Sequence, residues 1–171
     1  MKLSRGTRIS TVALLTVVAS LSLSVSAAQG DVADPRNRTV SGAVTGTTYF
    51  DFYSHGCTLV YQRFDLSFVD DRGGVGTLNA DTCASYEEIN GVYTPVVEGS
   101  FQLETAKGAL LTGDLRGELN AEVVPIRVVM TLTVESGTRS LAHAGGTIGF
   151  VGTWDQSSTA VVGTLAGELT R

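Results

Sequence analysis

Apolar and polar side chains alternate along most of this chain, and glycine interrupts the alternation at short intervals. From Val60 to Phe68, every second residue is Val, Gln, Phe, Leu or Phe, and the residues between them are polar or aromatic. Successive side chains of a β-strand point to opposite faces, so this period of two indicates strands with one buried face. No segment shows the spacing of an amphipathic helix, and the pattern therefore predicts a mostly antiparallel all-β protein.

Turn-forming stretches divide the pattern into eight expected strands. An open sheet of eight twisted strands would expose two edges, whereas closing the sheet into a barrel removes them. The sequence therefore predicts a single closed antiparallel barrel of about eight strands, with a two-sheet β-sandwich as the alternative. The expected strands are Val40–Tyr53, Val60–Phe68, Val75–Ala80, Val97–Thr105, Ala109–Glu122, Ile126–Val134, Thr147–Asp155 and Thr159–Thr170.

A seven-residue pattern occurs twice in the second half of the chain. Gly-Asp-Leu-Arg-Gly-Glu-Leu at 113–119 recurs as Gly-Thr-Leu-Ala-Gly-Glu-Leu at 163–169, and each follows a Gly-hydroxyl-aromatic step at 99–101 or 152–154. Each pair of segments predicts one hairpin, and we expect the two hairpins to occupy similar structural positions. Glycine and leucine alternate on one side of each second strand, where glycines would let bulky neighbours pack closely.

The N-terminus has the order of a secretory signal: three basic residues, then no charge from Ile9 to Gly30, with small residues towards the end. We expect cleavage after Ala27 or Ala28, with an uncleaved membrane anchor as the alternative. This predicts a signal peptide at 1–28, a flexible segment at 29–39 and a barrel domain at 40–171. The mature protein is expected to be secreted or in the cell envelope, without stable membrane insertion.

Charge and cysteine content refine this picture of an exported domain. The whole chain has a net charge of −5, and loss of the three basic residues of the signal leaves 9 basic against 17 acidic residues, a net charge of −8. Because the remaining basic residues are scattered singly, nucleic acid is not an expected partner. The two cysteines, Cys57 and Cys83, are expected to form a disulfide in an oxidising compartment, and two unpaired buried thiols are the alternative.

The second half also carries motifs of a known family. Gly-Ser-Phe-Gln-Leu-Glu-Thr at 99–105 is followed by Gly-x-Leu-x-Gly, by Leu-Thr-Val-Glu-Ser-Gly-Thr at 132–138 and by a glycine-rich return from Gly145. Over 97–171 the chain resembles bacterial secreted proteins with an allene oxide cyclase barrel-like domain. The resemblance implies an eight-stranded barrel with a central cavity, the shape shared by plant allene oxide cyclase and dirigent proteins. It assigns no functional residue to a position of this chain.

Candidate catalytic residues are few, because the chain lacks the usual nucleophile, zinc, redox and calcium motifs. If the polar faces of the first two strands line the lumen, Arg63 could hold a carboxylate or an oxyanion while Asp51 or Asp65 acts as acid or base. His143, beside a glycine-rich loop, is a further candidate. Only two histidines are present and they are far apart in sequence, so neither a metal site nor another cofactor is expected.

The orientation of the first two strands decides whether those residues can act. We expect their polar faces to point outward as a cross-strand ladder, because Phe50, Phe52, Phe64 and Phe68 would then fill the interior. The candidate ligand-binding residues are Tyr49, Tyr53, Tyr61 and Trp154.

Three functions stay open from the sequence. The first is binding of a small apolar molecule in the barrel lumen outside the cell, which makes a small hydrophobic ligand the expected partner. The second is an isomerase or cyclase of the allene oxide cyclase type, which predicts a titratable group with a perturbed pKa inside the cavity. The third is a structural or adhesive envelope protein with a filled barrel. Whether the protein is an enzyme, and its oligomeric state, are not determined by the sequence.

Overall fold

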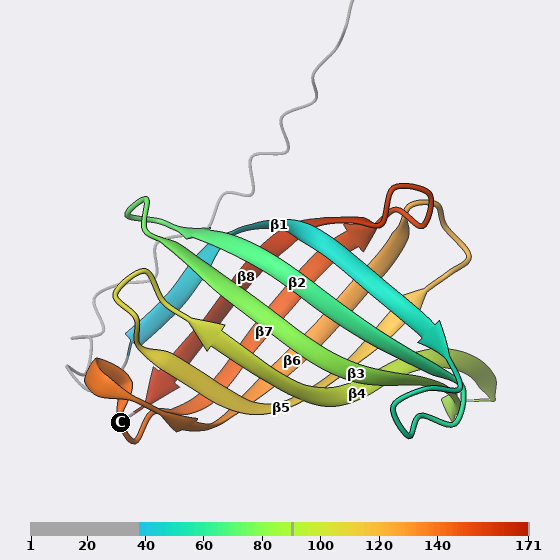
Figure 1. Ribbon diagram of the computed structural model, residues 1–171, viewed down its shortest axis with the longest axis horizontal. Coiled ribbons are helices and arrows are strands. Elements are labelled where there is room, and N and C mark those ends of the chain that lie inside the picture. The colour runs from blue at the N-terminus through green and yellow to red at the C-terminus, as the bar shows by residue number, and fades with distance from the viewer. Residues whose placement is uncertain (1–37, 90, 171) are drawn as a thin grey trace, which may run out of the picture. The chain divides into compact units, whose positions relative to one another are not determined.

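The computed structural model describes residues 38–89 and 91–170. The expected signal peptide with its two cleavage positions, and residues 29–37 of the expected flexible segment, lie outside these residues. Within them the chain forms a single closed barrel of eight antiparallel strands, in which each strand pairs with its neighbour in sequence and β1 pairs with β8 (Figure 1). The strands are β1 Arg38–Phe52, β2 Val60–Asp70, β3 Val75–Ile89, β4 Val92–Glu104, β5 Leu110–Asn120, β6 Ile126–Gly137, β7 Gly145–Trp154 and β8 Ala160–Thr170.

The closed barrel confirms the predicted fold class and excludes the two-sheet sandwich. A 3-10 turn, Arg139–Leu141, lies between β6 and β7. Among the described residues, no helical segment has the length and hydropathy that a membrane-crossing helix requires.

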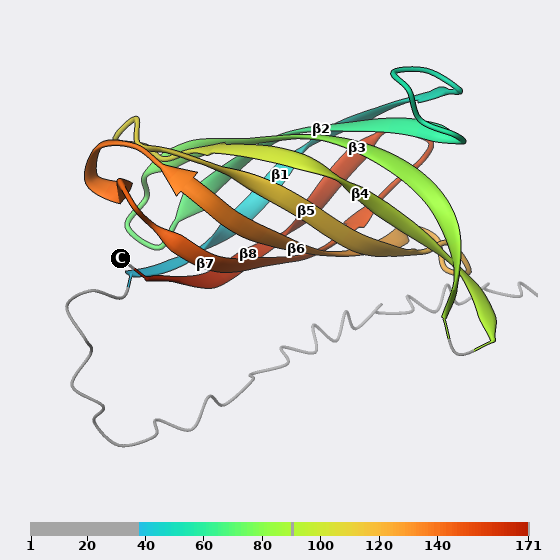
Figure 2. The same cartoon turned by 90° about the horizontal axis from the view of Figure 1, so that it is seen from below.

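The predicted boundaries of the third and fourth strands were wrong. β3 runs nine residues beyond Ala80, and β4 begins five residues before Val97. The outermost of these residues pair only with each other, because β2 pairs with β3 no further than Ala84 and β5 pairs with β4 no further than Val96. This part of the hairpin extends past its neighbours and bends (Figure 2). Because it has no closely packed face, it lacks the alternation by which strands are recognised.

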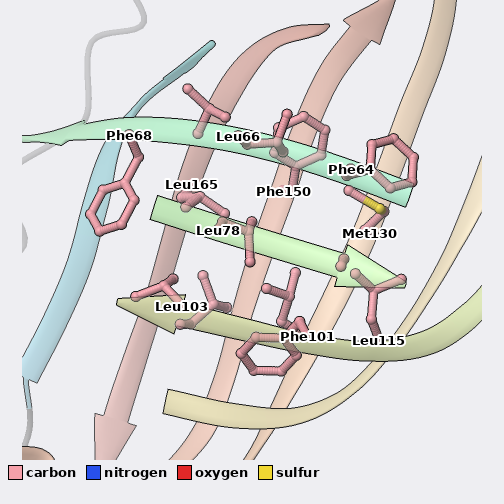
Figure 3. Close-up of a cluster of buried hydrophobic side chains, with 14 of the residues drawn as sticks. Phe64, Leu66, Phe68, Leu78, Phe101, Leu103, Leu115, Met130, Phe150 and Leu165 are labelled. Carbon is pink, nitrogen blue, oxygen red and sulfur yellow. The ribbon is translucent and has the colours of Figure 1, made fainter. Parts of the chain in front are cut away.

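The barrel interior is packed with apolar side chains from all eight strands. Phe64, Phe101 and Phe150 are almost completely buried, and they contact a continuous cluster of leucine, valine, isoleucine and methionine side chains (Figure 3). Eight strands enclose a space that side chains alone can fill. The central part of the lumen is therefore occupied by the protein itself.

Inward-facing glycines make this filling possible. A Cβ atom on Gly76 would lie 2.4 Å from the ring of Phe68, and one on Gly117 would lie 2.6 Å from Cγ of Met130. These glycines lie directly opposite the bulky residues in the strand register. The predicted close packing of bulky side chains on glycine is confirmed, and it explains why so many strand positions lack a side chain.

The two echoing segments each form a hairpin, β4–β5 and β7–β8, but they do not occupy similar positions. Phe101 pairs with Gly113, whereas the corresponding Trp154 pairs with Val161, so the two registers differ by two residues. The two turns also lie at opposite ends of the barrel, because β4 and β7 run in opposite directions. The shared pattern reflects the alternation of glycine and leucine on the inner face, where these residues lie in both β5 and β8.

Candidate functional site

One end of the barrel collects most of the exposed aromatic side chains. We call the end that carries the β1–β2, β3–β4, β5–β6 and β7–β8 turns the aromatic end; it is the end at which the β1 arrow terminates in Figure 1. Tyr53 and Tyr93 are more than 70% exposed there, whereas the exposed large apolar side chains near the opposite end are Val69 and Val75. Exposed aromatic clusters of this kind mark binding surfaces. The aromatic end comprises all five tyrosines of the chain, Tyr49, Tyr53, Tyr61, Tyr86 and Tyr93, together with Phe50, Phe52 and Trp154.

Three rings connect the barrel interior to the surface at this end. The ring centroids of Trp154 and Phe50 are 5.9 Å apart and those of Phe50 and Phe52 are 6.0 Å apart, both in edge-to-face geometry. The exposed fraction rises from 6% at Trp154 to 38% at Phe50 and 59% at Phe52. The prediction that Phe50 and Phe52 fill the interior was therefore wrong, although Phe64 and Phe68 do so. The two rings lie on the inner side of β1, but beyond the level at which the barrel closes over them.

A layer of buried polar groups lies beside these rings. The amide of Gln62 donates to Oγ1 of Thr48 at 3.2 Å, and Thr48 Oγ1 donates to the Arg63 carbonyl at 2.8 Å. Thr82 Oγ1 donates to the Gln62 carbonyl at 2.8 Å. Among the described residues, these three are the buried polar side chains, and none of them titrates. The layer can supply hydrogen bonds but no acid or base.

Two buried polar atoms at the aromatic end have no hydrogen-bond partner. Trp154 Nε1 and Ser54 Oγ are the two buried side-chain atoms of the described residues that lack one. A buried donor without a partner costs about 1–3 kcal/mol, and such groups are rare in native structures. Both atoms lie at the end that carries the exposed aromatic rings.

The β1–β2 turn at this end is held in an unusual conformation. Tyr53, His55 and Gly56 have φ values of 54°, 53° and 80°, in the left-handed region that non-glycine residues seldom adopt. The predicted disulfide is present: Cys57 in this turn is bonded to Cys83 on β3, with their Cα atoms 5.3 Å apart. The His55 ring also lies 4.0 Å, centroid to centroid, from that of Tyr61. These contacts fix the turn on the outer wall.

The polar ladder of β1 and β2 faces outward, as expected. Arg63 Nε lies 3.0 Å from Oδ1 of Asp65, its Nη1 lies 4.0 Å from Oδ1 of Asp81, and about half of each side chain is exposed. Tyr61 donates a short hydrogen bond to Asp81, which raises the pKa of the phenol, and the bond to Asp65 raises the pKa of Arg63. Arg63 and Asp65 are thus brought together in solvent, where they neutralise each other and do not enclose a substrate.

The remaining sequence candidates are split between the two ends. Asp51 lies directly opposite Tyr61 in the β1–β2 register and is half-buried at the aromatic end. His143 is exposed in the β6–β7 connection at the opposite end, so it cannot act with the other candidates. Trp154, Tyr49, Tyr53 and Tyr61 do share the aromatic end.

No family model, curated protein or solved structure matches this chain. The resemblance to allene oxide cyclase-like barrels is therefore supported only as far as the closed eight-stranded barrel.

Sequence reasoning missed several residues of this site. Tyr86 and Tyr93 lie on the part of the β3–β4 hairpin that was not predicted, and Ser54 lies in a turn with no motif. One signal was available: every tyrosine lies close to a strand end on the same side of the alternating topology. Consecutive strands of this barrel run in opposite directions, so the end of an odd-numbered strand and the start of the next strand lie at the same end of the barrel. Residues at these positions are therefore brought together.

Proposed function

We propose that this protein is a non-catalytic binding protein that captures a small apolar molecule at its aromatic end. The observation that carries the proposal is the coincidence, at one end, of exposed aromatic rings with the two unpartnered buried polar atoms, Trp154 Nε1 and Ser54 Oγ. Because side chains fill the interior, we propose that the ligand binds at the end of the barrel and not in the lumen. The matching ligand chemistry is a hydrocarbon body with a hydrogen-bond acceptor, such as a carbonyl or carboxylate.

Both parts of this ligand have a physical counterpart in the site. Apolar surface of Phe50 and Phe52 that a ligand covers contributes about 2.5 kcal/mol per 100 Å², before the costs of association are subtracted. An acceptor that reaches the indole N–H recovers part of the roughly 1–3 kcal/mol lost to its unpaired state. Phe50 packs edge-on against the indole and is partly exposed, so a shift of this ring is the movement that admits the acceptor.

The cyclase alternative receives no support from the described residues. It requires an acid or base inside the barrel, but the buried polar side chains are two threonines and a glutamine. The groups whose pKa is shifted, Tyr61, Arg63 and Asp155, lie on the outer wall or in a turn. The filled interior instead favours, as second candidate, a structural or adhesive envelope protein without a ligand.

Intrinsic fluorescence tests the proposal directly, because Trp154 is the only tryptophan of the chain. Titration with oleate, methyl oleate and 1-octadecene should give a saturable change in emission for all three. The hydrocarbon, which has no acceptor, should bind about tenfold more weakly, as a loss of 1.4 kcal/mol requires. Phe50→Ala/Phe52→Ala should abolish saturable binding of each probe, and calorimetry should confirm this loss independently of the fluorophore.

The matched control is Val69→Ala/Val75→Ala, which removes exposed apolar side chains near the opposite end. It should bind all three probes like the wild type. Absence of saturable binding to every probe, or equal binding after loss of both phenylalanines, would overturn the proposal and leave the structural role.

Export is part of the proposal, because the ligand is to be met outside the cell. The basic, apolar and small-residue order at the N-terminus supports it. Mass spectrometry of the protein secreted by an expression host should find a mature N-terminus at Ala28 or Gln29. An intact N-terminus on cell-associated protein would contradict this part.

A further inference from the structure

The outer wall of the barrel is divided into a charged half and an uncharged half. On β2 to β5, outward side chains form ion pairs, among them Arg63 with Asp65 and Arg116 with Glu87 and Glu98. On β6, β7, β8 and β1, the outward side chains between the strand ends are mostly threonine, valine, alanine, serine and glycine; the charged exceptions are Arg127 and Glu135 on β6 and Glu168 on β8. We call this second surface the uncharged face. Because so few charges lie on it, it differs from the ion-paired wall of β2 to β5.

The uncharged face exposes apolar surface at its centre. Val129, Val151 and Val162 are 39%, 47% and 56% exposed on three consecutive strands. The strand register places the smallest residues in one row across the same strands: Thr131 opposite Gly149, and Gly149 opposite Ala166. A row of small side chains lets another backbone approach closely along that line.

Two opposite charges border this face on a single strand. Arg127 and Glu135 both point outward from β6, four residues before and four residues after Thr131. Neither forms an ion pair within the described part of the chain. Their equal separation from Thr131 along the strand, four residues on either side, is the feature that identifies a partner.

We infer that the uncharged face binds a second copy of this chain, forming a two-fold dimer. The two-fold axis lies in the interface and runs along the row Thr131–Gly149–Ala166, perpendicular to the strands. A rotation about this axis maps a position four residues before Thr131 onto one four residues after it. Arg127 of each copy therefore lies against Glu135 of the other, and the two-fold symmetry gives two such ion pairs in one dimer.

The alternative two-fold axis, parallel to the strands, lacks this complementarity. If it ran along β7, it would place β6 against β8 at the same level, with Arg127 against Val162 and Thr133 against Glu168. The axis across the strands also leaves Glu168 without an opposite charge, against Thr164 of the other copy, but it sets each charge of β6 against its opposite and brings the two convex walls together at their smallest side chains. Because the walls curve apart away from this line, the long Arg127 and Glu135 side chains are the ones able to reach across.

Charge reversal tests this arrangement. Sedimentation equilibrium of the mature protein should show a monomer–dimer equilibrium. Arg127→Glu and Glu135→Arg should each weaken the dimer by about tenfold or more, because each change turns two attractive pairs into two repulsive ones. The double variant Arg127→Glu/Glu135→Arg should restore wild-type association. Arg116→Glu on the charged half is the control and should leave the dimer unchanged.

Each result supports or overturns the inference. A protein that stays monomeric at millimolar concentration refutes the dimer. A dimer that tolerates both single reversals, or that the double variant fails to restore, refutes this interface. Circular dichroism should show that all variants fold, since the substituted side chains are exposed. The result is independent of ligand binding at the aromatic end.

Discussion

Gly163→Ala is the substitution that tests most directly whether the barrel interior is filled. Gly163 is the fourth residue of β8, opposite Gly152 of β7 and next to the ring of Phe150. A Cβ atom at Gly163 would lie 2.6 Å from the Val151 carbonyl oxygen, 2.8 Å from Cα of Gly152 and 2.8 Å from Cε2 of Phe150. Two of these three atoms belong to the backbone, so they cannot rotate away as a flexible side chain would.

The expected cost follows from these contacts. Overpacking a core by one methyl group costs about 1–3 kcal/mol, and the lower entropy of the unfolded alanine chain returns only about 0.4–1 kcal/mol. Because a change here also strains the β7–β8 ladder, we expect Gly163→Ala to lower the free energy of unfolding by about 2 kcal/mol. Gly145→Ala is the control, since its Cβ would meet only Oγ1 of Thr170, at 3.9 Å, and the Val134 carbonyl oxygen, at 4.0 Å. It should be neutral or slightly stabilising.

Urea unfolding followed by far-ultraviolet circular dichroism measures both variants. With a slope of about 1–3 kcal/mol per molar urea, Gly163→Ala should lower the midpoint by about 0.7–2 M at unchanged slope. If its stability stays within about 0.5 kcal/mol of the wild type, there is free space beside Phe150. The side chains would then be packed less closely around this ring than the structure shows, and binding in the lumen would have to be tested beside binding at the aromatic end.

Three further predictions concern the disulfide and two titrating groups. Cys57→Ser/Cys83→Ser should lower the free energy of unfolding by about 3.5 kcal/mol, because on the chain-entropy model the bridge closes a loop over a separation of 26 residues. Urea unfolding measures this change, and a loss below about 1 kcal/mol would contradict the prediction. The hydrogen bond to Asp81 raises the pKa of Tyr61 in the folded protein above its ordinary value of 10.0. The stability that this bond contributes is therefore complete below pH 10.0, and it is lost as the pH rises through the pKa of Tyr61 in the folded protein. Asp81→Asn should move tyrosinate formation, followed by absorbance relative to Tyr61→Phe, to lower pH. Hydrogen bonds from Ser157 and Ser158 lower the pKa of Asp155, so the stability that these bonds contribute is present above pH 3.8 and is lost as the pH falls through the pKa of Asp155 in the folded protein. The free energy of unfolding of Asp155→Asn should therefore depend less on pH in the acid range than that of the wild type.

Alternation predicted the fold because most strands have one face on the core and one in water. Along β6, buried and exposed residues alternate without exception from Ile126 to Glu135, and the predicted strand matches the observed one closely. Alternation shows which face of a strand a side chain lies on, but it does not show how near to the end of the barrel that side chain lies. Phe50 and Phe52 were assigned to the inner side correctly, yet they lie past the level where neighbouring strands cover them, and so they are exposed.

The candidate site was less accessible to sequence reasoning, because its decisive features depend on what surrounds each atom. The missing partner of Trp154 Nε1 follows from how β6, β7, β8 and the Phe50 ring enclose the indole, and no local pattern encodes that arrangement. The outward direction of Arg63 and Asp65, in contrast, followed from parity alone, since Phe64 between them had to be buried.

The two proposals fit together in a way that constrains both. A two-fold axis perpendicular to the strands reverses the strand direction between the copies, so the aromatic ends of a dimer point away from each other and neither is covered. Ligand binding should then show one site per chain with the same affinity in the wild type and in Arg127→Glu, whatever the oligomeric state. An affinity that changes with dimerisation would mean that the second copy contacts the aromatic end, which an axis through Thr131, Gly149 and Ala166 does not allow. The stoichiometry of binding thus tests the direction of the axis independently of the charge reversals.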